Sequence, residues 1–389
     1  MYRSILFLLI LSASALPIGQ SAVITMVFPT GARSLGMGET GTALADDEDI
    51  GFYNPAGLGI FNDRWRRGAV TEFYEPLLPI FNLPELWHHN MAFVYQPNCL
   101  DVGGFSVYHN YINFGTNEWT NESGNVIGRA RSYEYVLNCS WGFNFKELGL
   151  KNHYFGVSGK YARSALAPGF GPRSEGVAST VAFDIGYLWQ CLRDVRFGLT
   201  LQNMGPAIFY VSEQEKDPIP FTLNLALAYK NDFQLGDVPF AQVRAEVRTN
   251  REIVKNYIDK PPDPFWKAIY TDLIHDTSSY SNFQEELDEF NWHLGAELTI
   301  FNSFSLREGY LFDKAGARFE HHWGLGFRLL NHFQLDWGTI YSPEGYLKGL
   351  FGHDGGSNGS RDGQWSISIT FFRMFDWSDA DKTWWRVKP

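Results

Sequence analysis

Side chains of alternating polarity run through most of this chain, and this period of two constrains its fold more than any other feature. In residues 221–229 every second side chain is Phe, Leu or Tyr, and those between are Thr, Asn or Ala. Residues 180–189 and 292–300 repeat the pattern. Successive side chains of a β-strand point to opposite faces, so each segment places one face against an apolar medium. A soluble β-sandwich shows the same alternation, so this pattern alone does not indicate a membrane protein.

The number and length of these segments distinguish a membrane barrel from a soluble sandwich better than the alternation does. Many are close to the roughly nine to eleven residues that a tilted strand needs to cross a bilayer. The candidate strands are residues 68–74, 90–96, 102–113, 132–143, 153–163, 179–190, 195–203, 220–230, 240–249, 291–301, 303–312, 321–330, 332–341 and 364–372.

The connectors between the candidate strands alternate in length. Short ones, such as 97–101 and 191–194, are each followed by a long one. Short periplasmic turns with longer outer loops are typical of membrane barrels, and a sandwich has no reason to produce this asymmetry. We therefore predict an all-β fold, a transmembrane antiparallel β-barrel of about 14 strands within residues 67–375. The long connectors are 75–89, 114–131, 164–178, 204–219, 250–290 and 342–363, with 313–320 as a brief exception.

Composition supports a barrel in the outer membrane of a Gram-negative cell. Aromatic residues make up 16% of the chain and mean hydropathy is only -0.22, which suits strands with one lipid face, one polar face and aromatic belts. The net charge of -11 argues against nucleic acid as a partner. Cys99, Cys139 and Cys191 are odd in number and far apart, so we expect no disulfide framework.

The N-terminus has the features of a secretory signal peptide at residues 1–22. Arg3 is followed by a short apolar run at 5–11, and small residues offer cleavage after Ala15 or Ala22. The apolar run is too short to span a bilayer. An even strand count would then leave both termini on the periplasmic side, including the Trp-rich tail at 376–389.

The strand pattern also assigns charged side chains to the barrel interior, where opposite charges can pair. Between a structural salt-bridge network and a selectivity filter, the network is the simpler interpretation. Glu308 is an exception because its register places it on the lipid face, so it lies near an interface or the register slips there. The predicted lumen-facing charges are Asp184, Arg244, Glu246, Arg248, Glu297, Arg307 and Asp336.

Residues 23–66 do not alternate and precede the first strand. A barrel of about fourteen strands is too wide to be filled by its own side chains. We therefore predict that this segment is a periplasmic plug. Its distinctive motif residues are Gly36, Met37, Gly38, Asn54, Pro55 and Gly57.

Several runs resemble the signature of PorV/PorQ-type proteins, within the broader FadL-like group of outer-membrane barrels. They include 31–38, 42–47 and 53–58, and further matches at 201–206, 264–268 and 307–316 extend over nearly the whole chain. Glu308 departs from the small residue expected there. The resemblance implies a fourteen-stranded barrel with an N-terminal plug, linked to type IX secretion, where members receive cargo from a translocon and pass it to a surface sortase.

Two outer loops suggest binding surfaces. Residues 264–274 carry Phe265, Trp266 and Tyr270 at spacings compatible with an amphipathic helix, which either docks a protein partner or packs on its own loops. Residues 75–89 are unusually apolar and form either an entrance for a hydrophobic ligand or a rim resting in the outer-membrane lipid.

No catalytic or cofactor motif is apparent, so we predict no enzyme activity and no cofactor. The pairs His88-His89 and His321-His322 do not indicate metal, because adjacent strand residues point to opposite faces. The sequence thus favours a non-enzymatic accessory protein of export to the cell surface. The alternatives are a FadL-like transporter of hydrophobic small molecules and a purely structural outer-membrane protein.

Overall fold

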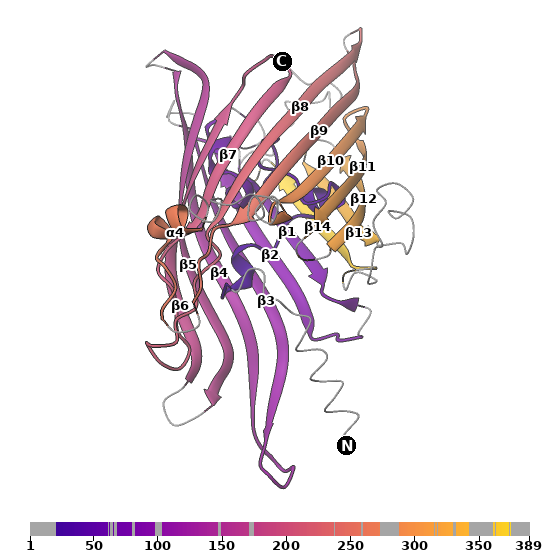
Figure 1. Cartoon of the computed structure of the whole chain (residues 1–389). Coiled ribbons are helices and arrows are strands. Elements are labelled where there is room, and N and C mark those ends of the chain that lie inside the picture. Colours follow the sequence, from indigo (N-terminus) through magenta and orange to yellow (C-terminus); the bar gives the residue numbers. More distant parts are fainter. Residues whose placement is uncertain are drawn as a thin grey trace.

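A computed structural model of the chain shows one closed antiparallel sheet of fourteen strands (Figure 1). The strands follow in chain order around the barrel, and β14 closes it by pairing with β1. Each predicted strand overlaps an observed one, so the predicted fourteen-stranded barrel is confirmed. The structure describes residues 21–341, 361, 363–372 and 374, except for 61, 63–64, 66–67, 80–81, 98–102, 147–148, 171–174, 237, 258–259, 273–287, 315, 317 and 330–331.

In the described part of the chain, four short helices precede the first barrel strand, and one helix lies in the connection between β9 and β10. The strands are β1 (Ala69–Pro76), β2 (Leu86–Tyr95), β3 (Gly104–Thr120), β4 (Val126–Phe145), β5 (Leu150–Phe170), β6 (Glu175–Trp189), β7 (Val195–Met204), β8 (Thr222–Leu235), β9 (Val238–Glu252), β10 (Asn291–Ile300), β11 (Phe304–Asp313), β12 (Arg318–Leu329), β13 (Phe333–Tyr341) and β14 (Trp365–Phe372). The helices are η1 (Ile24–Met26), α2 (Ala32–Gly36), α3 (Ile50–Tyr53), η2 (Pro55–Gly59) and α4 (Phe265–Thr271).

The two faces of the sheet differ as the alternation requires. Along β10 the even-numbered residues from Trp292 to Leu298 are exposed on the outside, and the odd-numbered ones from His293 to Thr299 are buried inside. Aromatic rings gather on the outer face, for example Trp87 beside Tyr111, with centroids 5.3 Å apart. This apolar outer face belongs to an outer-membrane barrel in contact with lipid. Among the described residues, no helix is both long and apolar enough to cross a membrane.

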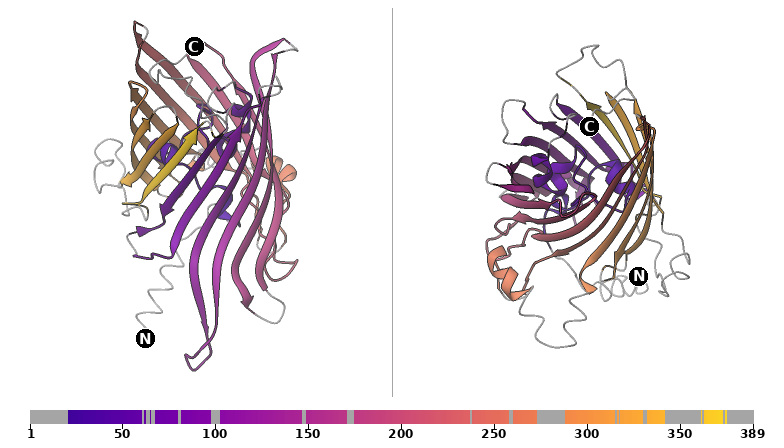
Figure 2. Two further views of the ribbon diagram at one scale, coloured as in Figure 1. Left: turned by 180° about the vertical axis from the view of Figure 1, so that it is seen from behind. Right: turned by 90° about the horizontal axis from the view of Figure 1, so that it is seen from above.

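Strands β3, β4 and β5 are much longer than predicted, and β6 begins earlier than predicted. Figure 2 shows these long strands from two further sides. The predicted loop 114–131 is mostly strand, with a turn at 121–125, and strand also covers most of the predicted loop 164–178. The loop prediction is wrong because the backbone pairing continues where the apolar alternation stops. Residues 116–118 are all exposed, so no side there needs to be apolar. The period-two signal marks the part of a strand that meets lipid, not the whole strand.

The described N-terminal residues and the end of β14 lie at opposite ends of the barrel. The Ala22 N–H donates to Pro218 O at the end of the long connections, and the Phe372 N–H donates to His332 O at the end of the short turns. The expected signal peptide, apart from residues 21–22, and the tail 376–389 lie outside the described residues, as does Cys99. Cys139 and Cys191 are free thiols.

Candidate functional site

Residues 21–60, called the inner segment below, run through the interior of the barrel. The helix α2 contacts β11 to β14, and η2 contacts β4 to β6 on another part of the wall. Most side chains of the inner segment are buried, including Leu35, Ile50 and Leu58 at 1% exposure or less. The segment therefore has two separate contacts with the wall, and each carries one of the motifs singled out in the sequence.

Glycines of the wall form the surface on which the first motif packs. A Cβ added at Gly309 would lie 2.1 Å from the Gly38 nitrogen, and one at Gly295 would lie 2.3 Å from Met37 O. Gly295 and Gly309 are direct cross-strand partners. The backbone of Gly36, Met37 and Gly38 thus touches the backbone of the wall without intervening side chains.

A second row of glycines receives the second motif. Gly142, Gly156 and Gly186 are cross-strand neighbours on β4, β5 and β6. A Cβ added at any of the three would lie 2.2 to 2.3 Å from an atom of Asn54 or Pro55. Asn54 also donates from its side chain to Thr42 O at 2.9 Å and accepts from the Ala56 N–H at 3.1 Å. Gly57 packs within the segment itself, since a Cβ there would meet Ile50.

Glu246 makes the most concentrated contact between wall and inner segment. Its carboxylate, 2% exposed on β9, accepts four consecutive backbone N–H groups of residues 41–44 at 2.8, 2.9, 2.9 and 2.6 Å. Two residues along the same strand, Arg248 donates to Glu39 O at 2.6 Å. Hydrogen bonds to a charged acceptor are roughly twice as strong as neutral ones, so the turn at 41–44 is held firmly to β9.

A network of ion pairs makes a further contact. Arg33 of α2 pairs with Glu297 of β10 at 2.9 Å and with Asp46 of the inner segment at 2.7 Å. Arg244 of β9 pairs with the same two acids, at 3.2 and 3.1 Å. Arg307 joins Glu297 to Asp336 at 2.7 and 2.8 Å. These interior charges therefore compensate one another, and their arrangement is that of a structural network.

The acidic turn of the inner segment contains two aspartates with opposite pKa shifts. Burial raises the pKa of Asp47 to about 7, because the charges of Glu48 and Asp46 add to the desolvation and exceed the effect of Arg33. Burial also acts on Asp46, but Arg33, Lys230 and Arg244 outweigh it and hold the pKa of Asp46 well below its usual range. Asp46 is therefore held as a carboxylate between Arg33 and Arg244.

Asp184 lies apart from this network, at a discontinuity in the wall. Strands β6 and β7 pair regularly up to Ile185 and Leu201, and the register then shifts. The Asn203 backbone is left-handed at the shift (φ 62°), and its N–H donates to Asp184 Oδ1 at 2.7 Å. Lys160 pairs with Asp184 at 2.8 Å, and both side chains are fully buried. Asp184 and Lys160 therefore stabilise, from inside the barrel, the point where the pairing of β6 and β7 is interrupted.

Outside the break lies an apolar groove of about 370 Å³, called the β6–β7 groove below. Phe183, Met204 and Pro206 line it, together with Phe265 and Trp266 of α4. Its inner wall is Ala182, which also belongs to a buried apolar cluster with Val23 and Met26 of the inner segment. The groove thus lies next to apolar side chains of the lumen.

The predicted helix at 264–274 is observed as α4, residues 265–271, on the outside of the barrel beside β5 and β6 (Figures 1 and 2). Phe265 packs against Phe183 and Phe221, with ring centroids 5.8 and 5.9 Å apart. Trp266 and Tyr270 are 67% and 59% exposed. The helix therefore packs on the wall by one aromatic residue and presents two others outward.

Two further cavities differ sharply in character. One, of about 750 Å³, lies between the inner segment and β8 to β12, and polar residues such as Glu39, Arg248 and His293 line it. The other, of about 500 Å³, is an apolar groove bordered by outward residues of β8 to β11, with Glu308 at its edge. The register is regular at Glu308, which pairs with His321 Nε2 at 3.2 Å on the outer face.

The apolar connection at 75–89 is partly buried and partly exposed, and its role stays a prediction. Leu77 is buried at 6% exposure and Leu83 is 53% exposed, and 86–89 belong to β2. His88 is fully buried inside, whereas His89 faces outward and pairs with Glu72 at 3.2 Å. The two histidines thus lie on opposite faces, as expected.

Sequence reasoning missed the two glycine rows and the partners of Glu246. The rows were detectable in principle, because glycine recurs at inward positions of neighbouring strands. The partners of Glu246 were not, because alternation gives the face of a side chain but not what lies opposite it.

No protein family model and no curated protein matches this chain. Solved structures do resemble it. The toluene transporter TodX of Pseudomonas putida is 11% identical, with 89% of this chain and 98% of that chain covered and a TM-score of 0.49. The monoaromatic hydrocarbon channel CymD is 12% identical over 88% and 97%, with a TM-score of 0.48. A FadL homologue of Pseudomonas aeruginosa is 12% identical over 88% and 98%, with a TM-score of 0.42. The PorV/PorQ assignment stays a prediction.

The glycine rows predict a specific sensitivity to side chains. We expect Gly156→Leu to force η2 away from the wall and to destabilise the barrel by about 1–3 kcal/mol, the usual cost of overpacking. Gly159→Leu, on the same strand, is the matched control, because nothing lies within 4 Å of a Cβ there. The measurement is the guanidinium unfolding midpoint in detergent. Equal midpoints for the two variants would contradict the packing argument.

Loss of the Glu246 charge should loosen the turn at 41–44. We expect Glu246→Gln to weaken its attachment by about 2–4 kcal/mol, since buried N–H groups lose a charged acceptor. Hydrogen exchange of the amides of residues 41–44, followed by mass spectrometry, should accelerate at least tenfold. The control is Glu308→Gln on the outer face, which should leave this exchange unchanged. Unaltered protection in the Glu246 variant would show that the contact does not hold the segment.

Proposed function

We propose that this chain is a gated outer-membrane channel, that the inner segment closes its lumen, and that hydrophobic small molecules pass beside this segment. The observation that carries the proposal is the β6–β7 groove. It is open to the lipid side of the wall, and through Ala182 it adjoins the apolar cluster of Val23 and Met26. An apolar solute would meet matching side chains along this path.

The charged contacts elsewhere in the lumen also favour a path along the β6–β7 groove. The contacts of Arg33, Arg244 and Glu246 are charged and fully paired, so an apolar solute would have to break them without replacing them. At Val23 and Met26 the inner segment presents apolar side chains, although Thr25 between them donates its N–H and its hydroxyl to Glu134 of β4 at 3.1 and 2.9 Å. The transporters with similar barrels supply a common fold and no further support.

The proposal includes an orientation. The short turns lie in the periplasm and the long connections at the cell surface, as in other membrane barrels. The inner segment then begins near the cell surface and ends near the periplasm, where β1 starts. The plug would thus enter the lumen from the outer side and not from the periplasmic side.

A role in protein export is the second candidate, and exposed α4 supports it. Trp266 and Tyr270 project from a helix that Phe265 fixes to the wall, and rigid exposed aromatics make good anchors for a protein partner. In this role the barrel would bind cargo, translocon or sortase without carrying out a reaction.

Filling the β6–β7 groove should slow transport. We expect Ala207→Trp, which places a large ring in this groove, to reduce at least fivefold the rate at which a small hydrophobic fluorophore crosses the outer membrane. Val157→Trp is the control, on the lipid-facing side of β5 and away from the groove. Unchanged entry in Ala207→Trp cells with normal amounts of folded barrel would reject this path.

The export role makes a separate prediction about α4. The double variant Trp266→Ser and Tyr270→Ser should lose at least tenfold in co-purification of a translocon or cargo protein, whatever its effect on fluorophore entry, since Trp266 also lines the β6–β7 groove. Trp323→Ser, an exposed tryptophan of β12, serves as the matched control. Retention of partners by the double variant would remove α4 as a docking surface.

A further inference from the structure

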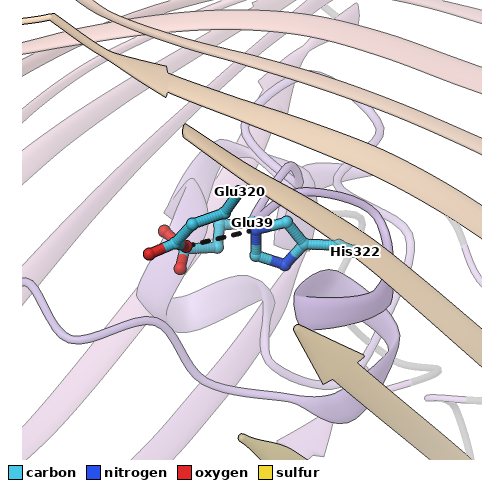
Figure 3. A group of neighbouring side chains, drawn as sticks. All are labelled: Glu39, Glu320 and His322. Atoms are coloured by element: carbon cyan, nitrogen blue, oxygen red, sulfur yellow. Dashed lines mark ion pairs between the residues drawn. The ribbon is translucent and has the colours of Figure 1, made fainter. Parts of the chain in front are cut away.

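We propose that Glu39, Glu320 and His322 bind a divalent cation such as zinc. The bound cation would link the inner segment to the barrel wall. Figure 3 shows the three side chains converging, and Glu39 also lines the polar cavity. Their ligand atoms all lie within 4.8 Å of one another, and all three residues are buried. This inference does not depend on the transport proposal, because cation binding is measured directly.

The site combines two residues of one strand with one of the inner segment. Glu320 and His322 are two positions apart on β12, so their side chains share the inward face, at 1% and 0% exposure. Glu39 follows the Gly36-Met37-Gly38 motif and is 6% exposed. Glu320 and His322 have the spacing Glu-x-His, which places two metal ligands on one face of a strand. In the sequence, attention goes to the adjacent pair His321-His322, whose side chains lie on opposite faces.

The hydrogen bond of His322 to a backbone carbonyl leaves the lone pair of its Nε2 atom directed towards the other two ligands. Its Nδ1 lies 2.8 Å from Leu35 O, and a carbonyl only accepts, so Nδ1 carries the proton. Nε2 then faces Glu320 Oε2 at 3.4 Å, and neither atom has a hydrogen-bond partner among the described residues. A backbone carbonyl that fixes the histidine tautomer in this way is a common outer partner of metal ligands.

In this structure the guanidinium of Arg361 supplies the positive charge that compensates the carboxylates of Glu39 and Glu320. Its guanidinium lies 2.6 Å from Glu39 Oε1 and 3.3 Å from Glu320 Oε2, while Arg318 lies 3.3 Å from the other Glu320 oxygen. Arg361 also lines the polar cavity, so it has space to withdraw. A cation would thus replace the guanidinium between the two carboxylates, and Arg361 and the cation compete for one place.

The ligand set selects the class of cation. One imidazole nitrogen with two carboxylates suits zinc and similar transition ions, whereas calcium and magnesium prefer oxygen ligands alone. Zinc holds ligand atoms at about 2 Å, so they lie roughly 3–3.5 Å apart. The pair Glu320 and His322 already meets this spacing, and Glu39 must close on them. Binding would therefore draw the inner segment towards β12.

The test is zinc binding to the untagged full chain in detergent. We expect one equivalent of zinc by mass spectrometry after dialysis. His322→Gln and Glu39→Gln should each weaken binding at least tenfold, and Arg361→Gln should tighten it at least tenfold by removing the competitor. Glu308→Gln is the matched control, because that Glu–His pair faces outward and should not contribute.

The zinc-binding test still distinguishes the outcomes if His322→Gln, a substitution in β12, does not fold. Glu39→Gln leaves the strands untouched, so it tests the site independently of His322→Gln. Zinc retained equally by Glu39→Gln and His322→Gln would overturn the proposal. So would zinc absent from both the native chain and Arg361→Gln, since removal of the competing guanidinium would then not have opened the site.

Discussion

The carboxylate of Glu246 is the contact on which the arrangement of the lumen depends. It gathers four backbone N–H groups of one turn, donors that would otherwise be buried without acceptors. Each such bond to a charged acceptor contributes roughly 1.5–3 kcal/mol, less the cost of burying the carboxylate. This contact fixes residues 41–44 between the two motifs, and so it sets the position of both on the wall.

The two glycine rows allow this position to be reached. A wall with ordinary side chains at Gly156 and Gly309 would keep the inner segment several ångströms away, and the chain could not place its backbone donors near Glu246. Shape and charge therefore act together. Glycines bring backbone to backbone, and Glu246 and Glu297 then meet donors at hydrogen-bond distance.

Much of the barrel was predictable from sequence, because lipid demands apolar residues on every second position. That demand ends at the membrane boundary, and so the pattern missed the extensions of β3 to β6, where residues such as Thr116 and Glu118 are exposed to solvent. Interior partners were beyond prediction for a different reason. Alternation assigned Arg307 and Asp336 to the lumen, but their pairing depends on register and on the path of the inner segment.

The distribution of charge divides the lumen into two parts with different consequences for movement. Along β9 to β13 the inner segment is held by paired charges, and moving it there separates Arg33 from Glu297 and residues 41–44 from Glu246 together. Near β6 the side chains of Val23, Met26 and Ala182 form an apolar contact, while Thr25 stays hydrogen-bonded to Glu134 of β4. In the proposed transport role, a solute on the apolar side would therefore need only a local displacement, while the charged side would keep the inner segment in the barrel.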